Sequence, residues 1–183
     1  DWQAQGTRLT QNVFHHNDRD LMIEVTHGPC LLDNNVFASG YFFDNMAQGT
    51  AMAHNLIAGY IHRGDVLDRA TPYHFPHTTQ AAGCAVVYSG DDRMYNNLFT
   101  GDGAFADDWG CHGTAGYDGC SLPEEYHRRL LAEGNTDAEK YYKVPQPAYA
   151  GGNAYLGSAK AFRGEKNPLA CACAADVEIV CDG

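Results

Sequence analysis

The segment LLDNNVFASG, residues 31–40, contains an asparagine, Asn35, that is followed by three apolar residues and then by a serine and a glycine. The same phrase recurs along the chain, with asparagines at Asn12, Asn35, Asn55, Asn97 and Asn153. The steps between them are 23, 20, 42 and 56 residues, which we interpret as one unit, one unit, two units of 21, and one unit enlarged by an insertion. A period of about 21 residues is typical of repeat proteins whose units stack.

The repeated phrase favours a short strand and a tight corner, because β-branched and aromatic residues follow each asparagine. A leucine ladder is absent, and helical repeats are longer. We therefore expect an all-β protein, with residues 1–183 forming a single right-handed parallel β-helix domain. The asparagines should stack at its corners, where asparagine tolerates left-handed backbone. Asn34 is expected to belong to the ladder together with Asn35, and the alternating segment 176–180 to form a last strand.

An insertion is expected over residues 103–150, with a short helical segment near 121–143. Ser121 and Glu124 have the spacing of a capping box at the start of the first helix. A second, shorter helix is expected from Asp137. These helices would interrupt the β-helix without belonging to its repeat.

The composition narrows the classes of partner. The net charge is −11, and the 12 lysines and arginines form no cluster. Nucleic acids and anionic membranes require a basic patch, so neither is expected as a partner. No apolar run reaches the length of a membrane span, and no signal-peptide pattern is present. A homo-oligomer remains possible.

The seven cysteines are odd in number and irregular in spacing, which predicts free or buried thiols rather than a disulfide framework. Such thiols favour a reducing compartment, so a cytoplasmic location is slightly preferred. Cys171 and Cys173 lie too close together for a zinc-binding pair, and no metal or organic cofactor is expected.

Two acidic residues, Asp1 and Glu24, lie 23 residues apart, which equals the first step of the asparagine series. Neighbouring parallel strands lie about 4.8 Å apart, so residues one coil apart should stack. Their carboxyl groups would then lie roughly 5 Å apart, which is the separation that retaining glycosidases need. An ionised Asp1 would favour the protonated form of Glu24, which could then act as an acid. Chance can also place two acids one coil apart in so acidic a chain.

The segments DWQAQGTR and DLMIEVTHGP, taken with AQGTAMAHNLIAG, GDDRMYNNLFTG and GGNAYLGSAKAFRGEKNPL, resemble glycoside hydrolase family 120, the β-xylosidases built on a right-handed parallel β-helix. The resemblance extends to about Leu169. It implies that Asp1 is the nucleophile and Glu24 the general acid/base. It also implies release of xylose from the non-reducing end of short xylo-oligosaccharides with retention, and arabinose remains an alternative sugar.

The resemblance further implies that the chain is a piece of a longer catalytic domain whose upstream coils are missing. We expect this piece alone to be inactive, because its first residue would be the nucleophile. The cysteine-containing tail departs from the ending that is expected of the family.

Further candidates for substrate binding are His27, Gln48, Tyr73, His74 and His77. His27 could hydrogen-bond the sugar, orient Glu24, or be only a turn residue. The segment TPYHFPH is interpreted as a proline-bounded loop beside the scaffold, and such loops often bind ligands. Two histidines without a third ligand do not predict a zinc site.

Two alternatives belong to other classes. A non-catalytic β-helix that binds carbohydrate or a surface would share the asparagine series but would not need the acidic pair. A polysaccharide lyase would need basic residues and calcium, and residues 1–60 contain few basic residues. Asp91 and Asp92 could hold calcium, but a structural role beside Arg93 is favoured.

Overall fold

The computed structural model describes residues 2, 4–75, 77–101, 110–133, 136–175 and 177–180. Most of its strands pair in parallel, in three sheets. The first sheet contains β1 (Thr7–Thr10), β4 (Cys30–Asp33), β7 (Thr50–Ala53), β12 (Asp92–Tyr95) and β14 (Ala148–Gly151), in that order. The second runs in the order β16 (Leu169–Cys171), β15 (Ala154–Gly157), β13 (Leu98–Gly101), β8 (Leu56–Ile57), β5 (Val36–Phe37) and β2 (Val13–Phe14). The third contains β3 (Leu21–Glu24), β6 (Tyr41–Met46) and β9 (Tyr60–Arg63).

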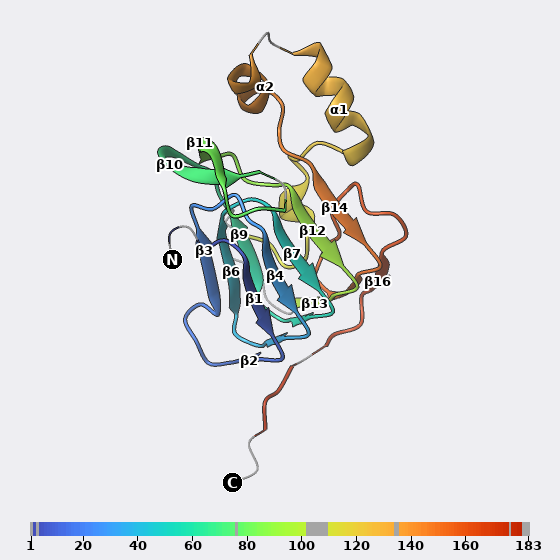
Figure 1. The fold of residues 1–183 in the computed structure, drawn as a ribbon. Helices are drawn as coiled ribbons and strands as arrows, with labels where there is room; N and C mark the ends of the chain where they lie inside the picture. The colour runs from blue at the N-terminus through green and yellow to red at the C-terminus, as the bar shows by residue number, and fades with distance from the viewer. Residues whose placement is uncertain are drawn as a thin grey trace.

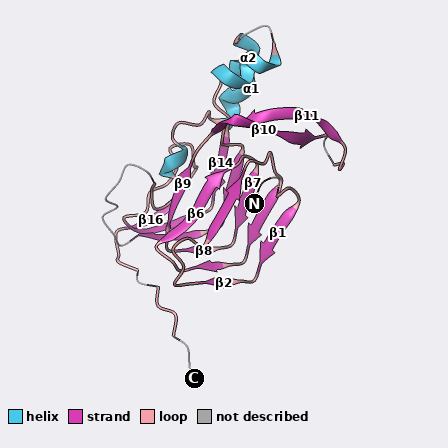
Figure 2. Ribbon diagram, turned by 90° about the vertical axis from the view of Figure 1, so that its left-hand side faces the viewer, coloured by secondary structure: helices cyan, strands magenta, loops and turns pink. Residues whose placement is uncertain are grey.

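From β1 to β9 the chain visits the sheets in a fixed sequence, whereas the described chain after β13 returns to the first sheet without a third-sheet strand. It passes through the first, second and third sheets and then returns to the first, one strand further along, so that β4 follows β3 and pairs with β1 (Figure 1). The view in Figure 2 shows the strands of successive passes stacked beside one another. The prediction of a mostly β protein with parallel sheets is therefore confirmed.

The step of 42 residues from Asn55 to Asn97 is a single pass, not two units of 21. Leu56 pairs directly with Leu98, and Asn55 donates to the Oδ1 of Asn97. The additional residues form an antiparallel hairpin of β10 (Val66–His74) and β11 (Ala81–Val87), which lies above the ends of the parallel strands in Figure 2. The prediction failed because the hairpin happens to have the length of one further repeat.

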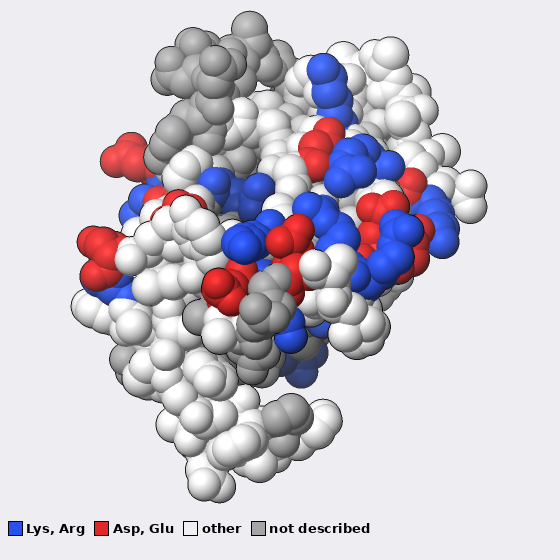
Figure 3. All heavy atoms as spheres, turned by 90° about the horizontal axis from the view of Figure 1, so that it is seen from above, with Lys and Arg blue, Asp and Glu red and all other residues white. Residues whose placement is uncertain are grey.

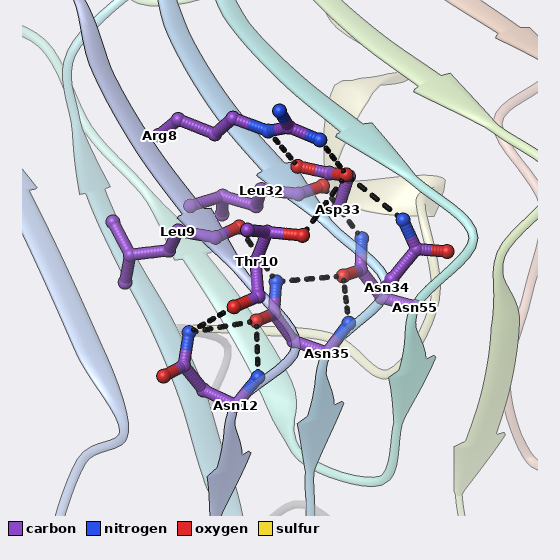
Figure 4. Close-up of polar contacts among 9 residues, drawn as sticks. All are labelled: Arg8, Leu9, Thr10, Asn12, Leu32, Asp33, Asn34, Asn35 and Asn55. Carbon is purple, nitrogen blue, oxygen red and sulfur yellow. Dashed lines mark hydrogen bonds and ion pairs between the residues drawn. The ribbon is translucent and has the colours of Figure 1, made fainter.

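The asparagine ladder is confirmed, and Figure 4 shows its first part. Asn12 donates from its backbone N and its Nδ2 to the Oδ1 of Asn35, at 3.1 and 3.2 Å. The same double contact joins Asn35 to Asn55, Asn55 to Asn97, and Asn97 to Asn153. From Asn35 onward, each amide oxygen thereby accepts from the corner backbone of the preceding pass, and for this reason the phrase recurs in the sequence.

The left-handed backbone lies one residue earlier than expected. The residues that precede the five ladder asparagines have positive φ: Gln11, Asn34, His54, Asn96 and Gly152. Asn34 is therefore not a ladder member. Its φ is +55°, and its amide donates to Asp33 instead (Figure 4).

The ladder ends at a carboxylate, Glu165, which the sequence did not indicate. Its Oε1 accepts from the backbone N and the Nδ2 of Asn153, both at 3.0 Å. Its Oε2 accepts from the hydroxyl of Tyr155. A carboxylate has only acceptor sites, so it suits the end of a row in which every amide presents donors.

Apolar side chains fill the space between the sheets in rows that follow the register. In the second sheet, Phe14 stacks on Phe37 with ring centroids 5.0 Å apart, and Phe99 stacks on Tyr155 at 5.3 Å. Leu32, Met52 and Met94 occupy equivalent positions of the first sheet and are fully buried. These rows hold the strand ends in place.

Two α-helices lie between β13 and β14 among the described residues, preceded by a short 3-10 helix at Ala115–Tyr117. They are α1 (Pro123–Ala132) and α2 (Asp137–Lys143), which agrees with the expected segment 121–143. The predicted capping box of α1 is wrong, because Leu122 occupies the N-cap and the Ser121 hydroxyl donates to the carbonyl of Pro145. The capping box belongs to α2 and is formed by Thr136 and Glu139.

Two expectations about the tail are corrected. The described residues 177–180 form no strand, and β16 is the last strand of the described chain. Cys171 and Cys173 are joined as a disulfide, whereas Cys30, Cys84, Cys111 and Cys120 are free thiols. In the part of the chain that is described, no helix is long and apolar enough to cross a membrane.

A buried polar cluster links neighbouring passes at the start of β7 and β12 in the first sheet. Asp92 is 0% exposed, and its two oxygens accept from the backbone N of Thr50 and from the Nδ2 of Asn45, each at 2.8 Å. Burial raises the pKa of Asp92 to about 7, although the Thr50 N–H, Tyr117 and the charge of Arg63 lower it. The Oδ1 of Asn45 has no hydrogen-bond partner among the described residues.

We predict that Asp92→Asn flattens the dependence of folding stability on pH. The folded pKa of about 7 lies above the ordinary value of 3.8, so the folded state binds more protons than the unfolded state between these values. Stability in the wild type should therefore fall as pH rises from about 4 to about 7. The amide introduced by the substitution does not titrate. Its oxygen can still accept from the backbone N of Thr50, and its Nδ2 can donate to the Oδ1 of Asn45 once the Asn45 side-chain amide has rotated by 180°.

Urea unfolding from pH 4 to pH 8 measures this effect as the difference between wild type and variant. Asp68→Asn, which changes an exposed carboxylate on β10, is the matched control. A variant that retains the wild-type pH profile would contradict the role of Asp92.

Candidate active site

Glu24 lies at the corner between the third and first sheets. It is the last residue of β3 and pairs with Met46 of β6, and its side chain is 22% exposed. Residues at alternate positions of a strand face one side, so Glu24 points away from the core residue Ile23, which is 3% exposed. The carboxylate is thus fixed at a strand end while remaining accessible.

The backbone turns sharply directly after Glu24. Val25 has a φ of +45°, which is rare for a β-branched residue, and its side chain is fully buried. Gly28 also has a positive φ, and a Cβ there would lie 2.6 Å from the carbonyl oxygen of Gly49. Strained backbone of this kind is concentrated at functional sites, which makes this corner a candidate site.

Asp1 lies outside the described residues, so its distance from Glu24 stays a prediction. The register that underlies the prediction is visible nearby. Thr7 pairs with Cys30, an offset of 23 residues, and the backbone N of Gly6 donates to the carbonyl of Pro29 with the same offset. A continuation of this register to residue 1 would bring Asp1 beside Glu24.

Two side chains that the sequence analysis missed lie next to Glu24. Arg69 of β10 places its Nη2 3.7 Å from the Oε2 of Glu24. The guanidinium of Arg69 also lies over the ring of Trp2, 5.1 Å from its centroid. The residue that follows Asp1 in the chain is therefore joined to Glu24 through Arg69. No motif in the sequence around Arg69 marks it as a site residue, because it reaches Glu24 only through the folding of the hairpin.

His27 and Tyr73 come together on one side of the corner. The Nε2 of His27 contacts the carbonyl of Ala85 at 3.0 Å, and its ring meets the edge of Tyr73 with centroids 5.8 Å apart. Burial lowers the pKa of His27, although hydrogen bonds to the backbone of Ala85 and Thr71 oppose this. The neutral ring donates to Ala85, so His27 fastens the hairpin to the corner. Its described contacts give no support to a role in orienting Glu24.

The hairpin also corrects the prediction for TPYHFPH. Tyr73 and His74 lie on strand β10 rather than in a loop, whereas His77 lies in the turn and is exposed with a φ of +60°. Tyr73 is 41% exposed beside His27 and can present its ring to a ligand. No contact of His74 or His77 with Glu24 is found among the described residues.

Gln48 lies at the next corner but has a structural partner. Its Oε1 accepts from the backbone N of Tyr88 at 3.1 Å, at the point where the chain leaves the hairpin. Asp91 pairs with Arg93 at 3.2 Å, which supports the structural interpretation of the Asp91–Asp92 pair. Within the described residues, no group of three or more His, Cys, Asp and Glu side chains could hold a metal ion.

The fold of this chain is similar to that of a solved structure. That structure is described as XylC in complex with xylose, and the match has a TM-score of 0.82 and 45% sequence identity. It covers 91% of this chain and 26% of XylC, so the chain spans about a quarter of the length of that protein. No protein-family model and no curated protein matches this chain.

Proposed function

We propose that this chain is part of a retaining β-xylosidase of the kind found in glycoside hydrolase family 120. In this proposal the three sheets are the faces of a right-handed parallel β-helix, and residues 1–183 belong to a longer catalytic domain. The enzyme releases xylose from the non-reducing end of short xylo-oligosaccharides. The similarity to XylC, which was solved with xylose, supports the choice of sugar.

The proposal rests on the offset of 23 residues between paired positions on neighbouring passes. This offset holds for β1 and β4 and extends to Gly6 and Pro29. If it continues, the carboxyl groups of Asp1 and Glu24 lie about one strand spacing apart, roughly 5 Å. This separation suits double displacement and leaves no room for the water that an inverting enzyme requires.

The residues would act in two steps. Asp1 attacks the anomeric carbon while Glu24 protonates the departing glycosidic oxygen, and a xylosyl ester forms on Asp1. Glu24, now ionised, removes a proton from water as this water attacks the same carbon and frees the Asp1 carboxylate. Arg69, whose Nη2 lies 3.7 Å from the Oε2 of Glu24, would hold the carboxyl group of Glu24 in position through both steps.

Product stereochemistry tests the proposal. The full-length protein is incubated with xylotriose, and the anomeric proton of newly released xylose is followed by NMR before mutarotation. We expect β-xylose to appear first, together with xylobiose, because retention keeps the configuration and exo attack removes one unit. α-Xylose as the first product would contradict the retaining mechanism, and internal cleavage would contradict exo action.

The exposed aromatic residues favour one second candidate, a non-catalytic carbohydrate-binding module. Trp2, Tyr73 and Phe75 are 45%, 41% and 49% exposed, and Trp2 and Tyr73 lie near the corner of Glu24. Binding of xylotriose without any cleavage would favour this candidate over the enzyme.

A further inference from the structure

A hollow lies at the base of the hairpin, where the chain enters β10 and leaves β11. Its cavity volume is about 360 Å³, near the lower end of the range for ligand sites, which is about 300–1,000 Å³. The side chains that matter for its chemistry are Arg63, Asp65, Tyr88, Ser89 and Gln146. They come from the end of β9, from both ends of the hairpin, and from the segment before β14.

Neither Glu24 nor Arg69 lines this hollow. Val66 and Val87 pack with Val25 and Met46 in a small buried cluster. In the chain, Glu24 precedes Val25, whereas Asp65 precedes Val66 and Tyr88 follows Val87, and only Asp65 and Tyr88 of these neighbours line the hollow. A ligand in the hollow would therefore not occupy the position of the proposed reaction.

The hollow presents donors and acceptors that are held in place. The Nη1 of Arg63 donates to the hydroxyl of Ser89 and its Nε to the carbonyl of Gly116, each at 3.2 Å, so the guanidinium is fixed. Gln146 is 5% exposed, and its Oε1 accepts from Tyr126 of α1. Its Nε2 is buried and has no hydrogen-bond partner among the described residues, which is costly unless a ligand or water provides one.

The charges of the hollow compensate one another. The charged residues of its lining are one cation, Arg63, and one exposed carboxylate, Asp65. On the face that Figure 3 shows, Lys and Arg are interspersed with Asp and Glu, and no region of a single sign dominates it. An anion would meet Asp65 and a cation would meet Arg63, so the lining suits a neutral ligand that both donates and accepts hydrogen bonds.

We propose that this hollow is a second, non-catalytic binding site for a small neutral saccharide, of the size of a monosaccharide or disaccharide. Vicinal hydroxyls can bind Arg63 and Asp65 together, and the ring of Tyr88 provides an apolar surface for a sugar face. The site goes beyond the proposed function, because its occupation requires neither Asp1 nor Glu24.

Isothermal titration of the full-length protein with xylose, and separately with xylobiose, tests this site. Asp65→Ala is the main variant because its side chain is exposed and its loss should not disturb folding. Tyr88→Leu is the second variant, since the backbone N of Tyr88, not its ring, makes the bond to Gln48. Glu24→Ala reports on the other site, and Glu125→Ala on α1 is the matched control.

We expect binding that survives Glu24→Ala and weakens about tenfold or more in Asp65→Ala and in Tyr88→Leu. Glu125→Ala should bind as the wild type does. Saccharide binding that both hollow variants leave unchanged, or binding that disappears with Glu24→Ala alone, would overturn the proposal. An inactive protein that retains binding sensitive to Asp65 would refute the proposed catalysis and support this site.

Discussion

Glu24→Ala is expected to lower kcat/KM on xylobiose by about 10²- to 10⁴-fold, which is the usual contribution of a general acid or base. The loss should be much smaller for the first step on an aryl xyloside with a good leaving group, because such a group departs without a proton. The second step still lacks its base, so the xylosyl enzyme should accumulate and a burst of the aryl product should precede slow turnover. Pre-steady-state absorbance measures this burst.

Added azide separates the two carboxylates. In Glu24→Ala it needs no base and should attack the xylosyl enzyme, which yields β-xylosyl azide and restores turnover. In Asp1→Ala it should instead replace the missing nucleophile and yield the α anomer. Glu125→Ala removes an acid from α1, where it pairs with Arg128, and serves as the control. Wild-type rates of xyloside hydrolysis in both the Asp1 and the Glu24 variants would refute the assignment of Asp1 as nucleophile and Glu24 as general acid/base.

The ladder could be predicted from sequence because its energetic requirement is local and repeated. Each of these corners uses a side-chain amide that both donates and accepts, and the short side chain of asparagine places it beside the backbone, so Asn12, Asn35 and Asn55 stand in phase. Parallel sheets and the approximate strand positions follow directly. The residue with left-handed backbone was misplaced by one, since asparagine at Asn34 and at Asn35 satisfies different requirements.

The hairpin was missed for a physical reason. Its two strands pair with each other in antiparallel fashion and need no ladder asparagine, so the spacing of the asparagines does not reveal it. Arg69 was missed with it, because its contact with Glu24 depends on how the hairpin folds back over the corner. The sequence therefore predicts those residues of the candidate site that belong to the repeat. The residues of the hairpin that surround them are placed by tertiary contacts and cannot be predicted in this way.

The buried positions of the repeat are also those where we expect substitutions to destabilise the protein most. Asn97→Asp should destabilise the protein by about 3–5 kcal/mol or more, a large part of the stability of an ordinary domain. Asn97 is 2% exposed, and its Nδ2 donates to the carbonyl of Met52 and to the Oδ1 of Asn153, at 2.9 and 3.1 Å. An aspartate would turn a carboxylate oxygen toward both acceptors, losing two hydrogen bonds and burying a charge.

Asn12→Asp is the matched control, because Asn12 makes equivalent contacts at the exposed start of the ladder. Water can solvate the carboxylate introduced there, so we expect a loss of at most about 1 kcal/mol. Urea unfolding of both variants measures the difference, which should shrink at low pH, where the carboxyl group introduced by Asn97→Asp is protonated and can again donate one hydrogen bond. If the two substitutions cost the same, the buried amide at Asn97 does not stabilise the stack by its hydrogen bonds, and packing of the apolar rows alone must hold the passes in register.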